Sequence, residues 1–214
     1  MPKLHSSLGP NPRLVRMFLV EKGIDENHVE RVHYDIITGE NRRSKEYLAR
    51  NPLGTMPALE LEDGTVLTES WPICEFIEEM HPQPNLFGET PLERAEVRKW
   101  ARLFDQEVVV PMTMGFRAGA GRPMFAPRMS VVSEAAGAEL SAMADEKWRW
   151  FDQALGGSNH IALGRFTFAD LLIFCFANFG FTVGWKLPEG TANLARFVDT
   201  HNTRPSAGIW RQAE

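Results

Sequence analysis

The sequence predicts an α/β unit over residues 1–82 followed by an all-helical unit over residues 92–214. Strand-like and helix-like segments alternate up to residue 82, whereas the rest of the chain shows helical periodicity only. Residues 83–91 are rich in proline, glycine and turn-forming residues, which indicates a linker between the two units.

The first unit has the expected order strand, helix, strand, helix, hairpin, helix. Asn11 is the expected cap of the first helix, with Pro12 as its first residue. Asp63 and Gly64 separate two alternating segments, which is the strongest short-range signal of a β-hairpin. Strands that flank a helix should be parallel and hairpin strands antiparallel, so we expect a mixed four-stranded sheet of thioredoxin-like order, βαβαββα. The expected bounds are strands at 3–6 and 29–34, helices at 11–22 and 44–50, a hairpin over 57–68, and a helix capped by Ser70 that ends before His81.

The second unit contains apolar residues at helical spacing. One expected face holds Val97, Trp100, Phe104 and Val108, and another holds Leu140, Met143, Trp148, Phe151 and Leu155. Residues 115–128 are rich in glycine, proline, arginine and methionine, and should break or bend the helical pair. Thr167 and Asp170 match the capping pattern of a hydroxyl followed three residues later by an acid. A last helix should end at Arg204 and Pro205.

The composition excludes several classes of protein. A chain of 214 residues that is 43% apolar and 24% charged is typical of an ordinary globular protein, and a net charge of -5 argues against nucleic acid or an anionic membrane as main partner. The N-terminus has no signal-peptide pattern and no run reaches membrane-spanning length, so we expect a cytoplasmic protein. Cys74 and Cys175 form no CxxC pair, and no histidine stands at metal-ligand spacing from a cysteine or an acid. We therefore expect buried thiols and no metal site.

Five motifs lie at residues 51–59, 67–70, 73–79, 164–170 and 204–206. Together they resemble the cytosolic glutathione transferases. This resemblance implies a glutathione co-substrate, a small electrophilic second substrate and a homodimer. It also implies that the first unit binds glutathione and that the helical unit contributes the pocket for the electrophile.

The same resemblance assigns residues to the parts of glutathione. Met56 precedes an expected cis-proline, Pro57, and its backbone would pair with the cysteinyl part as a strand does. Glu69 and Ser70 would hold the γ-glutamyl end, with Ser70 offering a hydroxyl at a helix N-terminus. Arg42 and Arg43 would pair with the glycyl carboxylate, although the alternative for both is a solvated run of charge.

The usual donor to the glutathione sulfur is missing. Many relatives place Ser, Tyr or Cys at the turn before the first helix, where this chain has Leu8 or Gly9. Three substitutes are available: the positive end of the first helix, the amide of Asn11, and the hydroxyl of Ser7. The alternatives are that Asn11 is only a cap and that Ser7 is a solvated loop residue. Gly9 resembles a fungal-type branch without a side-chain donor, while some bacterial relatives carry Pro-Asn here.

The electrophile pocket is expected to include Met112, Phe116 and Arg117, with Met114, Met124 and Trp185 as further candidates. The alternative for the apolar residues is plain core packing. The leading hypothesis is a transferase that joins the glutathione thiolate to a small apolar electrophile. The alternatives are a glutathione-dependent disulfide reductase or peroxidase, and a non-catalytic glutathione-binding or interaction protein.

Overall fold

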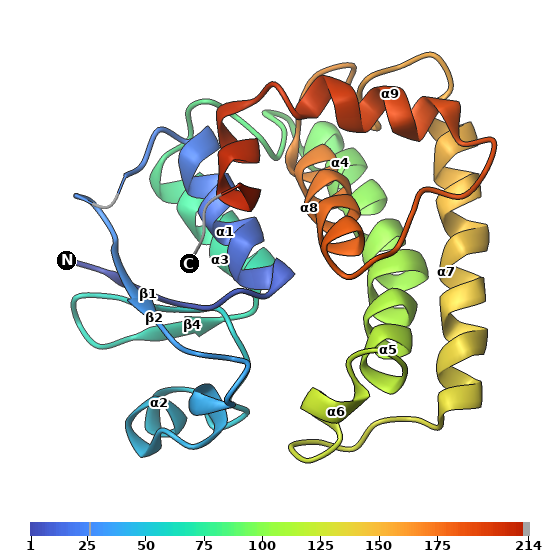
Figure 1. Ribbon diagram of the computed structural model, residues 1–214. Helices are drawn as coiled ribbons and strands as arrows, with labels where there is room; N and C mark the ends of the chain where they lie inside the picture. Colours follow the sequence, from blue (N-terminus) through green and yellow to red (C-terminus); the bar gives the residue numbers. More distant parts are fainter. Residues whose placement is uncertain (26, 212–214) are drawn as a thin grey trace. The chain divides into compact units, whose positions relative to one another are not determined.

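A mixed four-stranded sheet organises the N-terminal part of the computed structural model, which describes residues 1–25 and 27–211 (Figure 1). The strand order is β2-β1-β3-β4, with β1 parallel to β2 and antiparallel to β3. This confirms the predicted thioredoxin-like order and the hairpin, in which Gly64 has a φ of 85°. The strands are β1 (Lys3–Ser6), β2 (Glu30–His33), β3 (Ala58–Glu60) and β4 (Val66–Thr68).

Helices cover both faces of this sheet. α1 and α3 pack together on one face, and α2 lies on the other (Figure 1). The α2 face buries Tyr34, Tyr47 and Ala58, with Met56 packed against them. The helices are α1 (Pro10–Glu21), the 3₁₀ turn η1 (Glu40–Arg42), α2 (Lys45–Arg50) and α3 (Ser70–Met80).

Two helices begin earlier than predicted, α1 by two residues and α3 by one. α1 begins at Pro10 with Gly9 as its N-cap, so Asn11 is the second helical residue and not the cap. The ring of Pro10 already holds the φ that a helix requires, which lets the helix begin there. α3 begins at Ser70 with Glu69 as its N-cap at a φ of 69°, so Ser70 is not the cap either.

The chain divides into two compact units, which are described separately. The N-terminal unit is Met1–Phe87 together with the chain from Asn202 onward, and the helical unit is Gly88–His201. The helical unit contains α4 (Pro91–Phe104), the π-helical turn η2 (Asp105–Val109), α5 (Val110–Ala118), α6 (Arg122–Phe125), α7 (Glu134–Leu155), α8 (Phe168–Thr182) and α9 (Ala192–His201).

These units divide the chain differently from the boundaries expected at residues 82 and 92. The N–H groups of Leu86 and Phe87 donate to Glu78 of α3 at 2.9 and 3.2 Å, which attaches the linker to the N-terminal unit. The final 3₁₀ turn, η3 (Pro205–Trp210), packs on α1, where Arg204 Nε donates to Glu21 at 3.0 Å. Sequence analysis assigned this segment to the helical unit, because a contact between residues more than 180 positions apart leaves no local pattern in the sequence.

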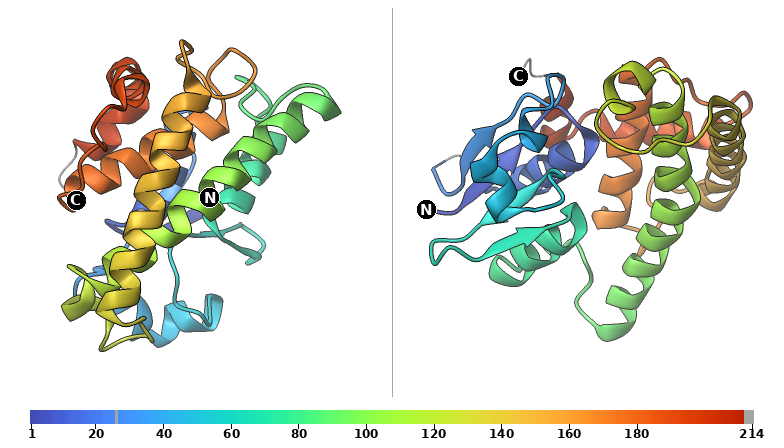
Figure 2. Two further views of the ribbon diagram at one scale, coloured as in Figure 1. Left: turned by 90° about the vertical axis from the view of Figure 1, so that its right-hand side faces the viewer. Right: turned by 90° about the horizontal axis from the view of Figure 1, so that it is seen from below.

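The helical unit is built around α8, whose residues from Phe168 to Ala177 are all buried. The capping box of Thr167 and Asp170 forms as predicted. α5 and α7 lie side by side (Figure 2), and Trp148, Phe151 and Leu155 of α7 are buried as expected, whereas Met143 is 56% exposed. None of the helices in the described residues is long and apolar enough to cross a membrane.

Candidate functional site

The N-termini of α1 and α3 meet in the N-terminal unit. The Ser70 hydroxyl donates a hydrogen bond to Asn11 Oδ1 at 3.2 Å, although the two residues lie 59 positions apart. The N-terminus of a helix carries a partial positive charge and backbone N–H groups without helical partners. Two such ends side by side make this corner of the unit favourable for anions.

The first turn of α1 offers one backbone donor to a ligand. Pro10 and Pro12 have no N–H, and the Arg13 N–H donates to Gly9 O at 3.2 Å. The Asn11 N–H makes no hydrogen bond within the described chain, so it remains available. Because Asn11 Oδ1 accepts from Ser70, the amide nitrogen of Asn11 is available as a second donor.

Glu69 stands beside this corner in an unusual backbone conformation. Its φ of 69° with a ψ of 131° is costly for a residue with a side chain. Strained residues of this kind cluster at ligand sites, where the surrounding structure holds them. The side chain of Glu69 is exposed and negatively charged next to Ser70, so it can accept from an ammonium group.

The loop before β3 presents a backbone edge. The Met56–Pro57 peptide bond is cis, as predicted. Within the described residues, no hydrogen bond uses the backbone N–H or C=O of Met56. Both groups can therefore pair with an extended peptide, in the manner of an added strand.

Two buried side chains hold that loop from below. Tyr47 donates its hydroxyl proton to Thr55 O, and Asn51 Nδ2 donates to the same oxygen at 2.9 Å. Burial raises the pKa of Tyr47 to about 12, so the phenol keeps its proton at physiological pH. Sequence analysis did not identify either residue as part of the site. The available sequence signal was that Tyr47, in α2, and Asn51, its C-cap, are four residues apart and directly precede the Pro57 loop.

A charged network beside Tyr47 combines the buried His5 with the half-buried Glu60 and Arg50. His5 Nε2 lies 2.9 Å from Glu60 Oε2, which also accepts from Arg50 Nε at 2.8 Å. The hydrogen bond from His5, followed by that from Arg50, lowers the pKa of Glu60 below its usual value. The Tyr34 hydroxyl is 3.3 Å from His5 Nδ1. This network joins β1, β2, α2 and β3 beneath the Met56 loop.

Arg42 and Arg43 end the η1 turn next to this loop. The stem of Arg42 packs on Gly54, since a Cβ at Gly54 would lie 3.2 Å from Arg42 Cγ. Neither arginine side chain makes a hydrogen bond or an ion pair with another described residue. Arg42 is half-buried and Arg43 exposed, so both cations can still accept a carboxylate partner.

Ser7 and Gly9 lie together at the end of β1. Ser7 is fully buried and its Oγ has no hydrogen-bond partner in the described chain, so the interpretation of Ser7 as a solvated loop residue is wrong. A Cβ built on Gly9 would lie 3.9 Å from Ser7 Oγ and 3.6 Å from Pro12 Cδ, both ordinary contact distances. The backbone therefore has room for a side chain at residue 9.

The helical unit contains a pocket of about 330 Å³ between α5, α7 and the end of α8. Met112 and Phe116 line this pocket, as does Trp185. Arg117 does not line it, because its guanidinium lies over the ring of Phe125, 5.6 Å from the centroid. Of the residues predicted for an electrophile pocket, Met112, Phe116 and Trp185 line this cavity, whereas Met114, Arg117 and Met124 do not.

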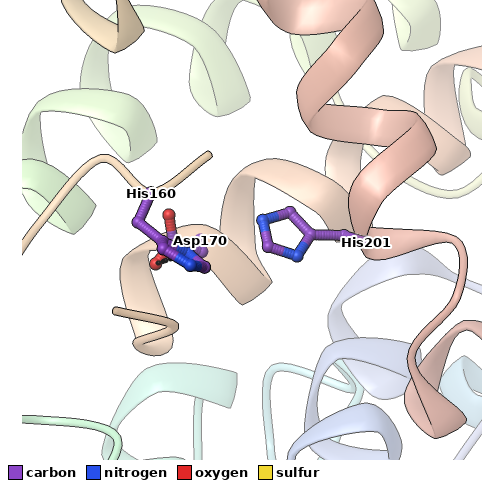
Figure 3. Close-up of side chains that lie close together, drawn as sticks. All are labelled: His160, Asp170 and His201. Carbon is purple, nitrogen blue, oxygen red and sulfur yellow. Dashed lines mark ion pairs between the residues drawn. The ribbon is translucent and has the colours of Figure 1, made fainter. Parts of the chain in front are cut away.

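The helical unit also brings two histidines and an acid together. His160 and His201 lie around Asp170 (Figure 3), and His160 Nδ1 is 3.9 Å from Asp170 Oδ2. Sequence spacing did not predict this proximity. Both carboxylate oxygens of Asp170 already accept hydrogen bonds. Oδ2 accepts from the Thr167 N–H at 2.9 Å, within the capping box, and Oδ1 accepts from the Ile161 N–H at 2.8 Å. We therefore assign the cluster a structural role at the start of α8.

The chain is similar in sequence and structure to known glutathione S-transferases. Residues 9–80 match the family model described as glutathione S-transferase, N-terminal domain, and residues 117–205 match glutathione S-transferase, C-terminal domain. The chain is 29% identical over 199 residues to glutathione S-transferase 2 of Saccharomyces cerevisiae, covering 92% of this chain and 84% of that protein. It is 27% identical over 175 residues to glutathione S-transferase GstA of Escherichia coli O157:H7, covering 81% of each. The crystal structure of Gtt2 from Saccharomyces cerevisiae superposes with a TM-score of 0.88 at 28% identity, covering 97% of this chain and 99% of that one.

Proposed function

Because the chain belongs to the glutathione S-transferase family, we propose that its N-terminal unit binds glutathione with the sulfur at the N-terminus of α1. The enzyme is a glutathione transferase. The hydrogen bond between Ser70 and Asn11, which joins the N-termini of α3 and α1, is the observation that most supports this placement of the sulfur.

Each part of glutathione has a matching group in this unit. The Met56 backbone pairs with the cysteinyl peptide, since its N–H and C=O have no partner in the described chain. The backbone N–H groups at the α3 N-terminus, beside Ser70, receive the γ-glutamyl carboxylate, and Glu69 receives the ammonium. Arg42 and Arg43 take the glycyl carboxylate as cations that lack an ion pair within the described residues.

Stabilisation of the thiolate is the chemical task of the α1 end. A free thiol has a pKa of about 8.5, so most of it is protonated at neutral pH. The Asn11 N–H, the Asn11 amide nitrogen and the α1 dipole all favour the thiolate, and the proton leaves to solvent. Ser7 Oγ, which lies near residue 9 and has no hydrogen-bond partner in the described chain, is a further candidate donor.

The thiolate then attacks the electrophile. A carbon–sulfur bond forms, and the electron pair of the broken bond leaves with the departing group or is protonated by water in an addition. Met112 and Phe116 are proposed as apolar walls for this second substrate. A cytoplasmic location and a homodimer are further parts of the proposal that follow from the family.

Gly9 favours a second candidate, a glutathione-binding protein without turnover. The residue at the N-cap of α1 has no side chain to donate to sulfur. The chain is also 29% identical over 168 residues to elongation factor 1-gamma of Schizosaccharomyces pombe, of which it covers 37%. A reductase or peroxidase role would rely on glutathione sulfurs alone, since Cys74 and Cys175 are both buried.

Calorimetric titration with glutathione near pH 7 tests the binding part of the proposal. We expect Ser70→Ala to weaken binding about fivefold, because the variant removes the hydrogen bond that orients the Asn11 amide, and one such bond contributes about 1 kcal/mol. Ser130→Ala, which changes an exposed serine of the helical unit, should leave binding unchanged. No heat of binding with folded wild-type protein would contradict the proposal.

A substrate panel separates the candidates once binding is measured. Turnover of aryl halides supports the transferase, while turnover restricted to mixed disulfides or peroxides supports the reductase or peroxidase. Glutathione binding without turnover of any member of the panel supports the second candidate and contradicts the transferase assignment.

A further inference from the structure

Glycines allow the elements around the pocket of the helical unit to approach one another closely. A Cβ at Gly115 of α5 would lie 2.9 Å from the carbonyl oxygen of Gly137 of α7, so these helices approach more closely than side chains would permit. A Cβ at Gly180 of α8 would lie 2.5 Å from Trp185 Cε3 and 2.8 Å from Met112 Cε. Glycine therefore allows the Trp185 indole to lie directly on the end of α8.

Aromatic rings form the apolar walls of this pocket. Phe116 and Phe179 meet edge to face, with centroids 5.5 Å apart and an interplanar angle of 90°. Trp185 lies against the fully buried Trp148 at a centroid distance of 4.9 Å, so its indole is held in place from behind. Fixed rings of this kind suit a flat aromatic guest, and their faces are electron-rich.

Two carboxylates, those of Asp145 and Glu134, are the charged groups among the described residues that line the pocket. Asp145 Oδ1 accepts a hydrogen bond from Trp185 Nε1 at 2.7 Å, which orients the carboxylate at the wall. Glu134, at the start of α7, lies 3.7 Å from Arg122 Nε, and this ion pair partly offsets its charge. No lysine, arginine or histidine is among the described residues that line the pocket.

We propose that this pocket binds positively charged aromatic molecules, with Asp145 as the counter-charge and Trp185, Phe116 and Phe179 as the stacking walls. The charge at Asp145 attracts a cation that the aromatic walls also favour, and the same charge repels an anion of equal shape. The proposal names the class of second substrate and, for its link to transfer, rests on the proposed function. Binding by the pocket can be measured without glutathione.

Calorimetric titration with two aromatic ions of similar shape tests the proposal. The probes are 1-methylquinolinium, a cation, and 1-naphthoate, an anion. Wild-type protein is expected to bind the cation at least about tenfold more tightly than the anion, since the Asp145 carboxylate in a partly desolvated wall attracts the cation and repels the anion. Asp145→Asn should reduce this preference to less than about threefold, because the charge is lost while the amide oxygen still accepts from Trp185.

Glu146→Gln is the matched control. Glu146 follows Asp145 on α7 and carries the same charge, but it is exposed and lies outside the pocket lining. It should leave the preference for the cation unchanged, which separates a local contact from the net charge of the protein. Circular dichroism and thermal unfolding confirm that both variants are folded.

Three results would overturn the proposal: equal affinity of wild type for both probes, the same loss of preference in both variants, or no binding of the cation. A parallel titration with glutathione distinguishes this failure from failure of the proposed function, since glutathione is proposed to bind residues of the N-terminal unit alone.

Discussion

Ser70 of α3 donates its hydroxyl proton to the side-chain oxygen of Asn11 of α1, across 3.2 Å. This contact fixes which end of the Asn11 amide is occupied, and it leaves the nitrogen to donate elsewhere. Pro10 and Pro12 have no N–H, so Asn11 supplies the available backbone N–H at this helix end and its amide nitrogen is a second donor. We propose that these two donors replace the side chain that Gly9 lacks.

A serine at residue 9 should raise activity. A Cβ at Gly9 meets only ordinary contacts, at 3.6 Å or more, and the φ of −65° is one that any residue adopts. A hydroxyl there can donate to the sulfur, so Gly9→Ser should increase kcat/KM by about three- to tenfold. Steady-state kinetics with a common aryl halide checks this. A fall in kcat/KM with unchanged glutathione affinity would contradict the placement of the sulfur at α1.

Tyr47→Phe should weaken glutathione binding without unfolding the protein. The variant removes the hydrogen bond to Thr55 O that supports the Met56 backbone, and one such bond contributes about 1 kcal/mol, or roughly fivefold in Kd. Tyr34→Phe is the control, since the Tyr34 hydroxyl contacts His5 and makes no hydrogen bond to the loop within the described residues. Equal effects of the two substitutions on glutathione Kd would show that loop support is not the cause.

The Glu60 carboxylate should make stability depend on pH in acid. The hydrogen bonds from His5 and Arg50 lower its pKa in the folded state, so the unfolded state binds the proton more tightly. Its contribution is complete above the unfolded value of about 4.5 and is lost as pH falls through the lower folded pKa. Chemical denaturation at pH 7 and pH 4 should show a smaller difference for Glu60→Gln than for wild type. An unchanged difference would count against the His5–Glu60–Arg50 network.

The close approach of α5 and α7 predicts a sharp cost for one added methyl group. A Cβ at Gly137 would lie 2.5 Å from Ala118 Cβ, so Gly137→Ala should lower the unfolding free energy by about 1–3 kcal/mol. Gly157→Ala is the control, because a Cβ there meets nothing within 4 Å. Thermal unfolding of the two variants checks this, and equal midpoints would mean that the helices can separate freely.

Features with a local signature could be predicted from the sequence. The Asp63–Gly64 hairpin, the Thr167–Asp170 capping box and the cis Met56–Pro57 bond each depend on a few adjacent residues, and all three are confirmed. The predicted starts of α1 and α3 were two residues and one residue too late, because Pro10 and Ser70 are as acceptable in the first turn of a helix as just before it.

Features that depend on distant residues could not be predicted. The burial of Ser7 and the packing of η3 on α1 arise from contacts between segments far apart in the chain. The support of Thr55 by Tyr47 and the approach of His160 to Asp170 likewise require the folded backbone.

The most direct test of the central claim is the pKa of the glutathione thiol in its complex. Ultraviolet difference absorbance of the thiolate is measured against pH for wild type, Asn11→Ala and Asn11→Asp, each saturated with glutathione. We expect wild type to hold the thiol pKa well below its free value of about 8.5, and Asn11→Ala to raise it toward that value. Asn11→Asp should raise it further, because a negative charge then faces the sulfur. A bound thiol pKa that is the same in all three proteins would contradict the assignment of Asn11 as the group that stabilises the thiolate.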